Sequence, residues 1–310
     1  MAALLSIVLP VFLVVGAGYL AVWRGIFSND AVDGLMVFTQ KFAIPCLLFS
    51  AIATLDLGQE FDWRLLISFY MGSASGFVLG ALGARILFRR SAVDSVVIGF
   101  CALFANTVLL GLPIHERAYG TAALAPNFAI IALHAPFCYL IGITTMEIVR
   151  ADRTNLATLV PQVGKAIFSN ALMIGIALGF AVNLSGVILP MVVTDALDLM
   201  IRAALPAALF GLGGVLYRYR PEGDAMVIGF VCILSLILHP AIGYGIGRGV
   251  ATLSDDQLRA VVVTAAMPPG INTYIFANMY GAARRVAASS LLIGTALTVI
   301  TAAVWIAVLP

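Results

Sequence analysis

The chain has 310 residues, of which 62% are hydrophobic and only 10% are charged. Soluble domains carry about 25% charged residues, so this composition excludes a water-soluble globular protein, and a net charge of +2 gives no sign of a nucleic-acid partner. Because backbone groups in lipid must be satisfied within each segment, and because the alternating pattern of a transmembrane barrel is lacking, the sequence predicts an all-α polytopic membrane protein.

Apolar runs of about 20 residues, the length that crosses the hydrocarbon core of a bilayer, recur along the whole chain and predict ten membrane-spanning helices. Their approximate limits are 3–22, 34–54, 65–88, 94–114, 122–148, 164–184, 193–216, 225–247, 257–280 and 286–309. In the third of these spans, Gly72, Gly76 and Gly80 follow the G-x-x-x-G spacing that permits close helix packing.

The distribution of Lys and Arg predicts the orientation of these spans. Of the 17 basic residues, 11 fall in one set of loops and four in the other, while Lys41 and Arg202 lie inside spans. The richer loops hold Arg24, Arg85, Arg89, Arg90, Arg150, Arg153, Lys165, Arg218, Arg220, Arg284 and Arg285. We therefore expect these loops to be cytoplasmic, with both termini on the outer side.

An internal repeat relates the two halves of the chain. The segment at 41–49 reads KFAIPCLLF and the segment at 202–210 reads RAALPAALF, which places their prolines 161 residues apart. The same offset relates Tyr119 to Tyr280 and Phe69 to Phe230. We expect two five-helix repeats, 1–148 and 164–310, joined by a short cytoplasmic linker at 149–163. Since five is odd, the second repeat has the opposite orientation, which is typical of secondary transporters.

One span in each repeat carries helix-breaking and amide residues near its centre. Proline removes a backbone donor, and broken backbone survives in lipid only where it is buried in protein or lines a cavity. The half-helix N-termini created by such breaks attract anions. The predicted substrate-binding residues are Asn106, Thr107, Gly111 and Pro113 in the first repeat, and Pro268, Pro269, Gly270, Asn272 and Thr273 in the second. The alternative is that these prolines only kink packed helices.

These motifs, together with LPVFLVVGAGYL (9–20) and IPCLLFSAI (44–52), resemble those of the auxin efflux carrier family, and in particular its bacterial malonate and malate permeases. The resemblance covers nearly the whole chain. It implies crossed broken helices 4 and 9, a scaffold of helices 1, 2, 6 and 7 that forms homodimers, and a moving transport domain of helices 3–5 and 8–10. It also implies a bacterial inner membrane. The long central loop of plant members is lacking.

Four ionisable residues within the spans are candidates for the pathway or for coupling to a proton or sodium ion. They are Lys41, His134, Arg202 and His239. The alternative for Lys41 and Arg202 is that they bind backbone carbonyls freed by the prolines that follow them. The alternative for His134 and His239 is that they are neutral and form hydrogen bonds to neighbouring helices. Asn127 and Tyr139 are further polar groups in span 122–148 that helical phase alone does not place.

The broken spans and the resemblance together lead us to expect a secondary carrier of small carboxylates. The resemblance implies malonate first and malate next as substrates, and an elevator-like movement. The sequence carries no phosphate-binding loop, so no ATPase activity is expected. No enzyme, metal or cofactor motif stands out, and the four cysteines are scattered. The alternatives are an efflux carrier of aromatic carboxylates and a membrane sensor that binds its ligand without net transport.

Overall fold

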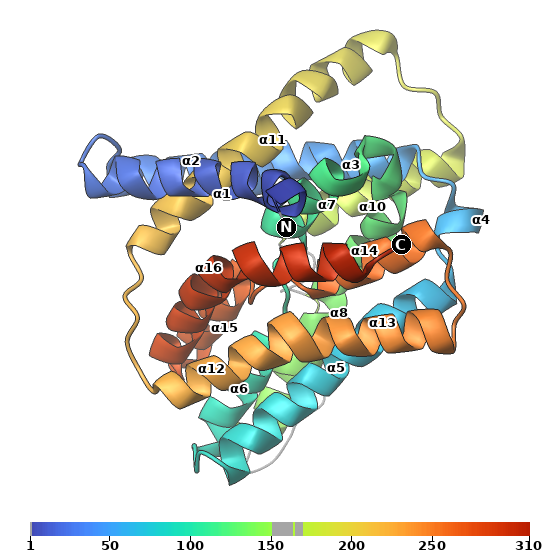
Figure 1. Ribbon diagram of the computed structural model, residues 1–310. Coiled ribbons are helices and arrows are strands. Elements are labelled where there is room, and N and C mark those ends of the chain that lie inside the picture. The colour runs from blue at the N-terminus through green and yellow to red at the C-terminus, as the bar shows by residue number, and fades with distance from the viewer. Residues whose placement is uncertain (1, 151–163, 165–169) are drawn as a thin grey trace. The chain divides into compact units, whose positions relative to one another are not determined.

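The computed structural model describes residues 2–150, 164 and 170–310, and in that part of the chain it is helical (Figure 1). Among these described residues, seven helical stretches are long and apolar enough to cross a membrane. They are Ser6–Trp23, Asn29–Ala53, Trp63–Ile86, Thr121–Arg150, Met191–Tyr217, Ala225–Gly249 and Arg284–Val308. The polytopic α-helical class is therefore confirmed. The ten-span count stays a prediction, and most of the expected linker at 149–163 lies outside the described residues.

The chain divides into two compact units. Unit 1 comprises residues up to Leu9, Phe61–Val163 and Tyr219–Pro310, and unit 2 comprises Pro10–Glu60 and Gly164–Arg218. The helix α1 (Ala2–Trp23) contributes its start to unit 1 and the remainder to unit 2.

Unit 1 contains the following elements. They are α5 (Trp63–Ile86), α6 (Ala92–Leu103), η2 (Thr107–Gly111), α7 (Leu112–Tyr119), η3 (Thr121–Leu124), α8 (Ala125–Arg150), α12 (Ala225–Ile233), η4 (Leu234–Leu238), α13 (His239–Gly249), α14 (Asp255–Ala265), α15 (Ile271–Tyr280) and α16 (Arg284–Val308). The helices α5 and α6 pack along each other, and α13 packs on α5 (Figure 1).

Small residues bring the helices of unit 1 close together. A Cβ atom added to Gly72 would lie 2.8 Å from the carbonyl oxygen of His239, and one added to Gly76 would lie 2.8 Å from that of Ala102. A Cβ on Gly80 would lie 3.0 Å from the Cα of Gly99. The predicted G-x-x-x-G face is therefore a packing surface, since helix backbones approach closely only where side chains are small.

Unit 2 is built from α2 (Asn29–Phe38), η1 (Thr39–Ala43), α3 (Ile44–Ala53), α4 (Leu57–Glu60), α10 (Ala171–Ser185), α11 (Met191–Tyr217) and the larger part of α1. A Cβ on Gly18 would collide with the carbonyl of Phe210, which shows how closely α1 approaches α11. The side-chain nitrogen of Asn183 donates to the carbonyls of Ile52, Ala53 and Leu55, and so satisfies the C-terminal end of α3.

Three prolines follow a widened helical turn. The five-residue π-turns η1, η2 and η4 end just before Pro45, Pro113 and Pro240, each of which is the second residue of the next α-helix. A proline ring clashes with the carbonyl four residues earlier and has no N–H to bond with it. Accommodating the ring widens the preceding turn, and the N–H of the residue before each proline donates to the carbonyl five residues back.

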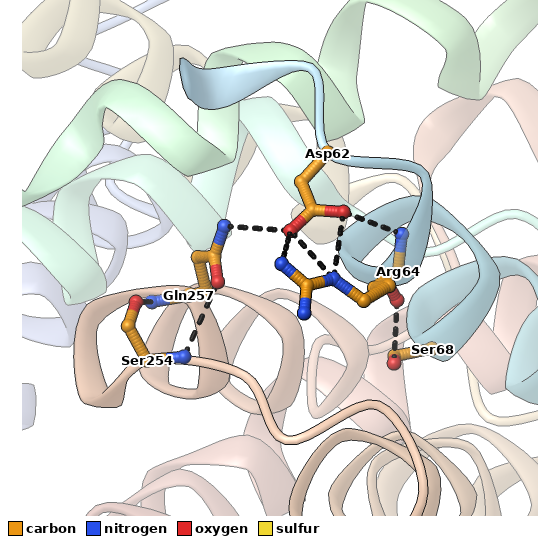
Figure 2. A network of polar contacts seen from close by, with 5 residues as sticks. All are labelled: Asp62, Arg64, Ser68, Ser254 and Gln257. Atoms are coloured by element: carbon orange, nitrogen blue, oxygen red, sulfur yellow. Dashed lines mark hydrogen bonds and ion pairs between the residues drawn. The ribbon is translucent and has the colours of Figure 1, made fainter.

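Asp62 and Gln257 link the beginnings of α5 and α14 in unit 1 (Figure 2). Asp62 caps α5 by accepting from the backbone N–H of Arg64, and its carboxylate pairs with the Arg64 guanidinium at 2.9 Å. Gln257 donates to Asp62 at 3.5 Å and forms a capping box with Ser254. Hydrogen bonds from the Arg64 side chain are the largest cause that holds the pKa of Asp62 below its ordinary value.

Because the pKa of Asp62 is lowered in the folded protein, its charge stabilises the fold above its ordinary pKa of about 4. This contribution is lost as the pH falls through the folded-state pKa. Asp62→Asn keeps a capping oxygen but loses the ion pair, so we expect it to cost about 0.5 kcal/mol at pH 7. Thermal unfolding of the purified protein should show a difference from wild type at pH 7 that shrinks below pH 4. Asp198→Asn, at an exposed carboxylate of α11, is the control; an unchanged difference at low pH would contradict this account.

Candidate functional site

Two non-helical stretches of unit 1 pair with each other inside the helical bundle. One separates α6 from η2 and the other separates α14 from α15. The N–H of Asn106 donates to the carbonyl of Pro268, and the N–H of Gly270 donates to the carbonyl of Phe104, both at 2.8 Å. These bonds form an antiparallel bridge between Ala105 and Pro269. We call residues 104–106 and 266–270 the paired break. Its two halves satisfy part of each other's freed backbone, as non-helical chain within a membrane requires.

The second half of the paired break contains three of the five residues that the sequence singled out there, and the other two follow it closely. Pro268, Pro269 and Gly270 lie between α14 and α15, and Asn272 and Thr273 lie in the first turn of α15. The Thr273 hydroxyl donates back to the carbonyl of Gly270 at 2.7 Å, which closes that turn.

The first half differs in detail from the expectation. The break lies at 104–106, so only Asn106 of the four predicted residues is part of it. Thr107 begins η2, while Gly111 and Pro113 are already helical, at the end of η2 and in the first turn of α7. Gly111 nevertheless faces the other half, because a Cβ on it would lie 3.4 Å from the side chain of Met267.

Two helical segments begin at the paired break without a side-chain cap. The cap residues are Asn106 for η2, whose side chain does not bond to the first turn, and Gly270 for α15, which has no side chain to do so. Uncapped N–H groups give the start of a helix a partial positive charge. The paired break therefore places positive potential from two segments beside the same residues.

Two asparagine amides at the paired break have unused donor groups. Asn106 is 5% exposed, and its side-chain nitrogen has no hydrogen-bond partner among the described residues. Asn272 is half-buried, and its side-chain oxygen accepts from the Tyr139 hydroxyl at 3.3 Å. This bond occupies the acceptor of Asn272 and leaves its N–H groups to bind something else. An unpaired buried donor costs about 1–3 kcal/mol, so a ligand that accepts from it is favoured.

His134 on α8 contacts the paired break directly. Its Nε2 lies 3.2 Å from the carbonyl oxygen of Ala105. Since a carbonyl can only accept, Nε2 carries the hydrogen, and the basic Nδ1 lies 3.8 Å from the sulfur of Cys138. His239 instead contacts Phe69. The centroids of the two rings are 4.8 Å apart, and the His239 ring donates to the Phe69 carbonyl. Of the two histidines, His134 is the one that holds the backbone of the break.

Asn127 is a further buried polar residue near the site. Its side-chain nitrogen donates at 2.8 Å to the hydroxyl of Thr264, which lies in the last turn of α14 before the break. Its side-chain oxygen has no partner among the described residues. Asn127 and Tyr139 could not be placed from the sequence, because the way in which α8 turns its faces toward α14 and α15 depends on packing.

Lys41 and Arg202 belong to unit 2, whereas the paired break belongs to unit 1. Lys41 lies in the π-turn η1 before Pro45, Arg202 lies in α11 before Pro206, and both are exposed. No ion pair reaches either side chain within the part of the chain that the structure describes.

Comparison with known proteins bears on what such a site does. The family model described as "Membrane transport protein" matches residues 3–306. A Rhizobium meliloti protein named "Putative malonate transporter" is 22% identical over 97% of this chain and 94% of its own length.

Two further relatives carry transport names. "Uncharacterized transporter YfdV" of Escherichia coli O157:H7 is 24% identical over 96% of this chain and 95% of its own length. "Auxin efflux carrier component 5" of Arabidopsis thaliana is 22% identical over 88% of this chain and 87% of its own length. The chain therefore belongs to the auxin efflux carrier family of membrane transport proteins.

Proposed function

We propose that this protein is a secondary carrier of small carboxylate anions, with malonate as the first candidate and malate as the next. The observation that carries the proposal is the buried side-chain nitrogen of Asn106, which lacks a partner among the described residues at a break where two helical segments begin. Amide donors and helix N-termini both favour a carboxylate over a cation or a neutral sugar. Asn272, with its oxygen occupied by Tyr139, would supply the second donor.

The aromatic side chains beside these donors support a small aliphatic substrate. Phe100 and Phe276 are fully buried and stacked on each other, with ring centroids 3.9 Å apart. The ring of Tyr139 lies 5.7 Å from that of Phe104 and 5.9 Å from that of Phe100. Because these rings cover one another, they offer little free face for stacking against an aromatic substrate. This favours malonate over an auxin-like acid, although some relatives are named auxin efflux carriers.

Two features support an inverted repeat with an elevator-like movement. Ser91 and Ser254 cap α6 and α14 at an offset of 163 residues, and Asp62 and Asp224 cap α5 and α12 at an offset of 162. These offsets are close to the 161 residues found in the sequence motifs. The division into two compact units supports assigning unit 1 to the moving transport domain and unit 2 to the scaffold.

Uptake of a dicarboxylate would require a coupled cation. Moving a negative charge into a cell against an inside-negative potential costs about 2.3 kcal/mol per 100 mV. We assign His134 as the carrier of a coupled proton, because it is the histidine that contacts the paired break. A sodium ion is the alternative coupling ion, and export would need neither.

We further propose a homodimer formed through unit 2 in a bacterial inner membrane, with both termini outside. The first half of α11 supports this face, because Met191, Val192 and Leu199 are 71–80% exposed. Eleven of 17 basic residues on one side support the orientation.

Counterflow of labelled malonate into proteoliposomes tests the function. Vesicles would hold the purified protein and excess unlabelled malonate, malate, indole-3-acetate or sodium chloride. We expect transient accumulation with malonate or malate inside and none with chloride. Accumulation with indole-3-acetate alone would establish the aromatic carrier instead. Ligand-dependent thermal stabilisation without counterflow would identify a sensor and overturn the proposal.

A further inference from the structure

The two ends of unit 1 differ in how their charges are arranged. One end is formed by the α5–α6 turn, the start of α12 and the α15–α16 turn. These segments touch, because Arg90 pairs with Asp224 at 2.8 Å, and Asp94 accepts from the N–H of Ala283 at 2.8 Å. The backbone carbonyl of Glu222 accepts from the hydroxyl of Ser289 on α16 at 2.7 Å. We call residues 85–94, 220–224 and 281–285 the basic end.

At the opposite end, charges are balanced by neighbours. Three arginines there pair with carboxylates, at 2.9, 3.6 and 2.8 Å. These pairs are Arg64 with Asp62, Arg248 with Asp255, and Arg259 with Asp256. A fourth, Arg117, donates to the carbonyls of Ser6 and Ile7. The arginines at this end therefore already have partners within the protein and do not require an external anion.

The basic end has more cations than its carboxylates pair with. Asp224 and Glu222 pair with Arg90 and Arg285, and Asp94 is engaged by Ser91 and by the Ala283 N–H. Four further arginines are exposed, and no ion pair reaches them from the described residues, although Arg85 donates to the carbonyl of Arg90 at 2.8 Å. They are Arg85, Arg89, Arg220 and Arg284. Arg284 also begins α16, where the positive end of the helix disfavours a cation unless an anion is near.

Arg89 has an unusual backbone conformation. Its φ of +53° lies in the left-handed region, which glycine adopts without steric cost and other residues rarely do. The turn that it makes ends α5, with the N–H of Arg90 bonding back to the carbonyl of Ala84. A position that suits glycine thus holds an exposed arginine, and strained residues of this kind concentrate at functional sites.

Apolar side chains lie next to these cations. Ile86 and Leu87, at the end of α5, are 69% and 68% exposed, and Met226 at the start of α12 is 71% exposed. In a membrane-spanning unit such side chains meet acyl chains. Unpaired cations next to exposed apolar side chains match the chemistry of an anionic phospholipid, which carries its phosphodiester directly beyond its acyl chains.

We propose that the basic end is a binding site for an anionic phospholipid. The arginines at positions 85, 89 and 284 bind its phosphodiester headgroup, and its acyl chains lie along the exposed end of α5. Arg220 adds to the positive electrostatic potential at the same end. This site is separate from the paired break and does not depend on what the protein transports.

Thermal unfolding of the purified full chain in a non-ionic detergent tests the site. We expect phosphatidylglycerol to raise the Tm about 5 °C more than phosphatidylcholine does, as a ligand of the folded state would. Arg89→Gly relieves the backbone and should leave the Tm in phosphatidylcholine equal or higher, while the increment from phosphatidylglycerol is lost. Arg284→Gln should reduce that increment. The matched control is Arg248→Gln at the opposite end, which should retain it.

Three results would overturn the proposal. In the first, the two lipids stabilise the wild-type protein equally. In the second, Arg89→Gly and Arg284→Gln both retain the full increment. In the third, soluble glycerophosphoglycerol produces the same increment as the lipid, which would identify a site for soluble phosphodiesters.

Discussion

Replacing Asn106 with alanine is expected to reduce malonate counterflow at least tenfold while leaving the Tm unchanged or higher. A hydrogen bond to a charged group contributes about 1.5–3 kcal/mol, which corresponds to a factor of about 10 to 100 in affinity. The same substitution removes a buried donor that has no partner among the described residues, so the fold loses no bond. Counterflow in proteoliposomes and thermal unfolding of the same preparation measure the two effects.

Asn272→Ala is expected to reduce counterflow similarly, and α15 offers a matched control. Asn278 lies on the same helix but is exposed, so Asn278→Ala should transport like wild type. If Asn106→Ala or Asn272→Ala transported malonate with unchanged affinity, the assignment of the substrate site to the paired break would be wrong. A carrier that moved malonate through other residues would still leave the family assignment intact.

Replacing His134 with phenylalanine and with glutamine should separate two roles of that residue. Phenylalanine removes the 3.2 Å bond to the carbonyl of Ala105, which keeps only its 2.9 Å bond from the N–H of Thr107, and the lost bond costs about 0.5–1.5 kcal/mol. We expect it to lower the Tm and to reduce counterflow at least tenfold. Glutamine keeps an N–H donor of similar reach but has no basic nitrogen that could carry a proton. It should therefore retain counterflow and lose uptake driven by a proton gradient.

His239→Gln is the control for this pair, because His239 donates to the carbonyl of Phe69 rather than to the paired break. It should retain both counterflow and proton-driven uptake. If His134→Gln accumulated malonate under a proton gradient as wild type does, His134 would be a positioning residue only. Sodium-driven uptake that is indifferent to pH would replace the proton with sodium in the coupling scheme.

Much of the fold follows from composition and length, because 20-residue apolar runs have few alternatives to membrane helices. The π-turns before Pro45, Pro113 and Pro240 were not predicted. Pro206 shows why, since it lies inside α11 with no such turn assigned before it. A proline indicates a local disturbance, and the surrounding packing decides between a widened turn and a kink.

The second half of the site was easier to predict than the first. The segment Pro268-Pro269-Gly270 cannot continue a regular α-helix, so the break at these residues could be predicted from the sequence. Residues Phe104 and Ala105 have no such signal, and their non-helical segment bonds to Pro268 and Gly270 in the structure. The contacts of His134 with Ala105 and of Tyr139 with Asn272 depend on how α8 packs. A sequence reveals which residues are unusual, but not which of them meet.

The paired break also has a consequence for biosynthesis. The helix α6 has 12 residues and is about 18 Å long, well short of a hydrocarbon core of about 30 Å. The non-helical backbone that follows it, residues 104–106, forms its hydrogen bonds with residues 268–270. Those residues leave the ribosome some 160 residues later. During that interval the half-length segment cannot be a finished membrane helix. The nascent chain must therefore keep it at the translocon, or on a chaperone of the membrane, until the C-terminal half arrives. Nonsense mutations before Pro268 should yield chains that quality-control proteases remove.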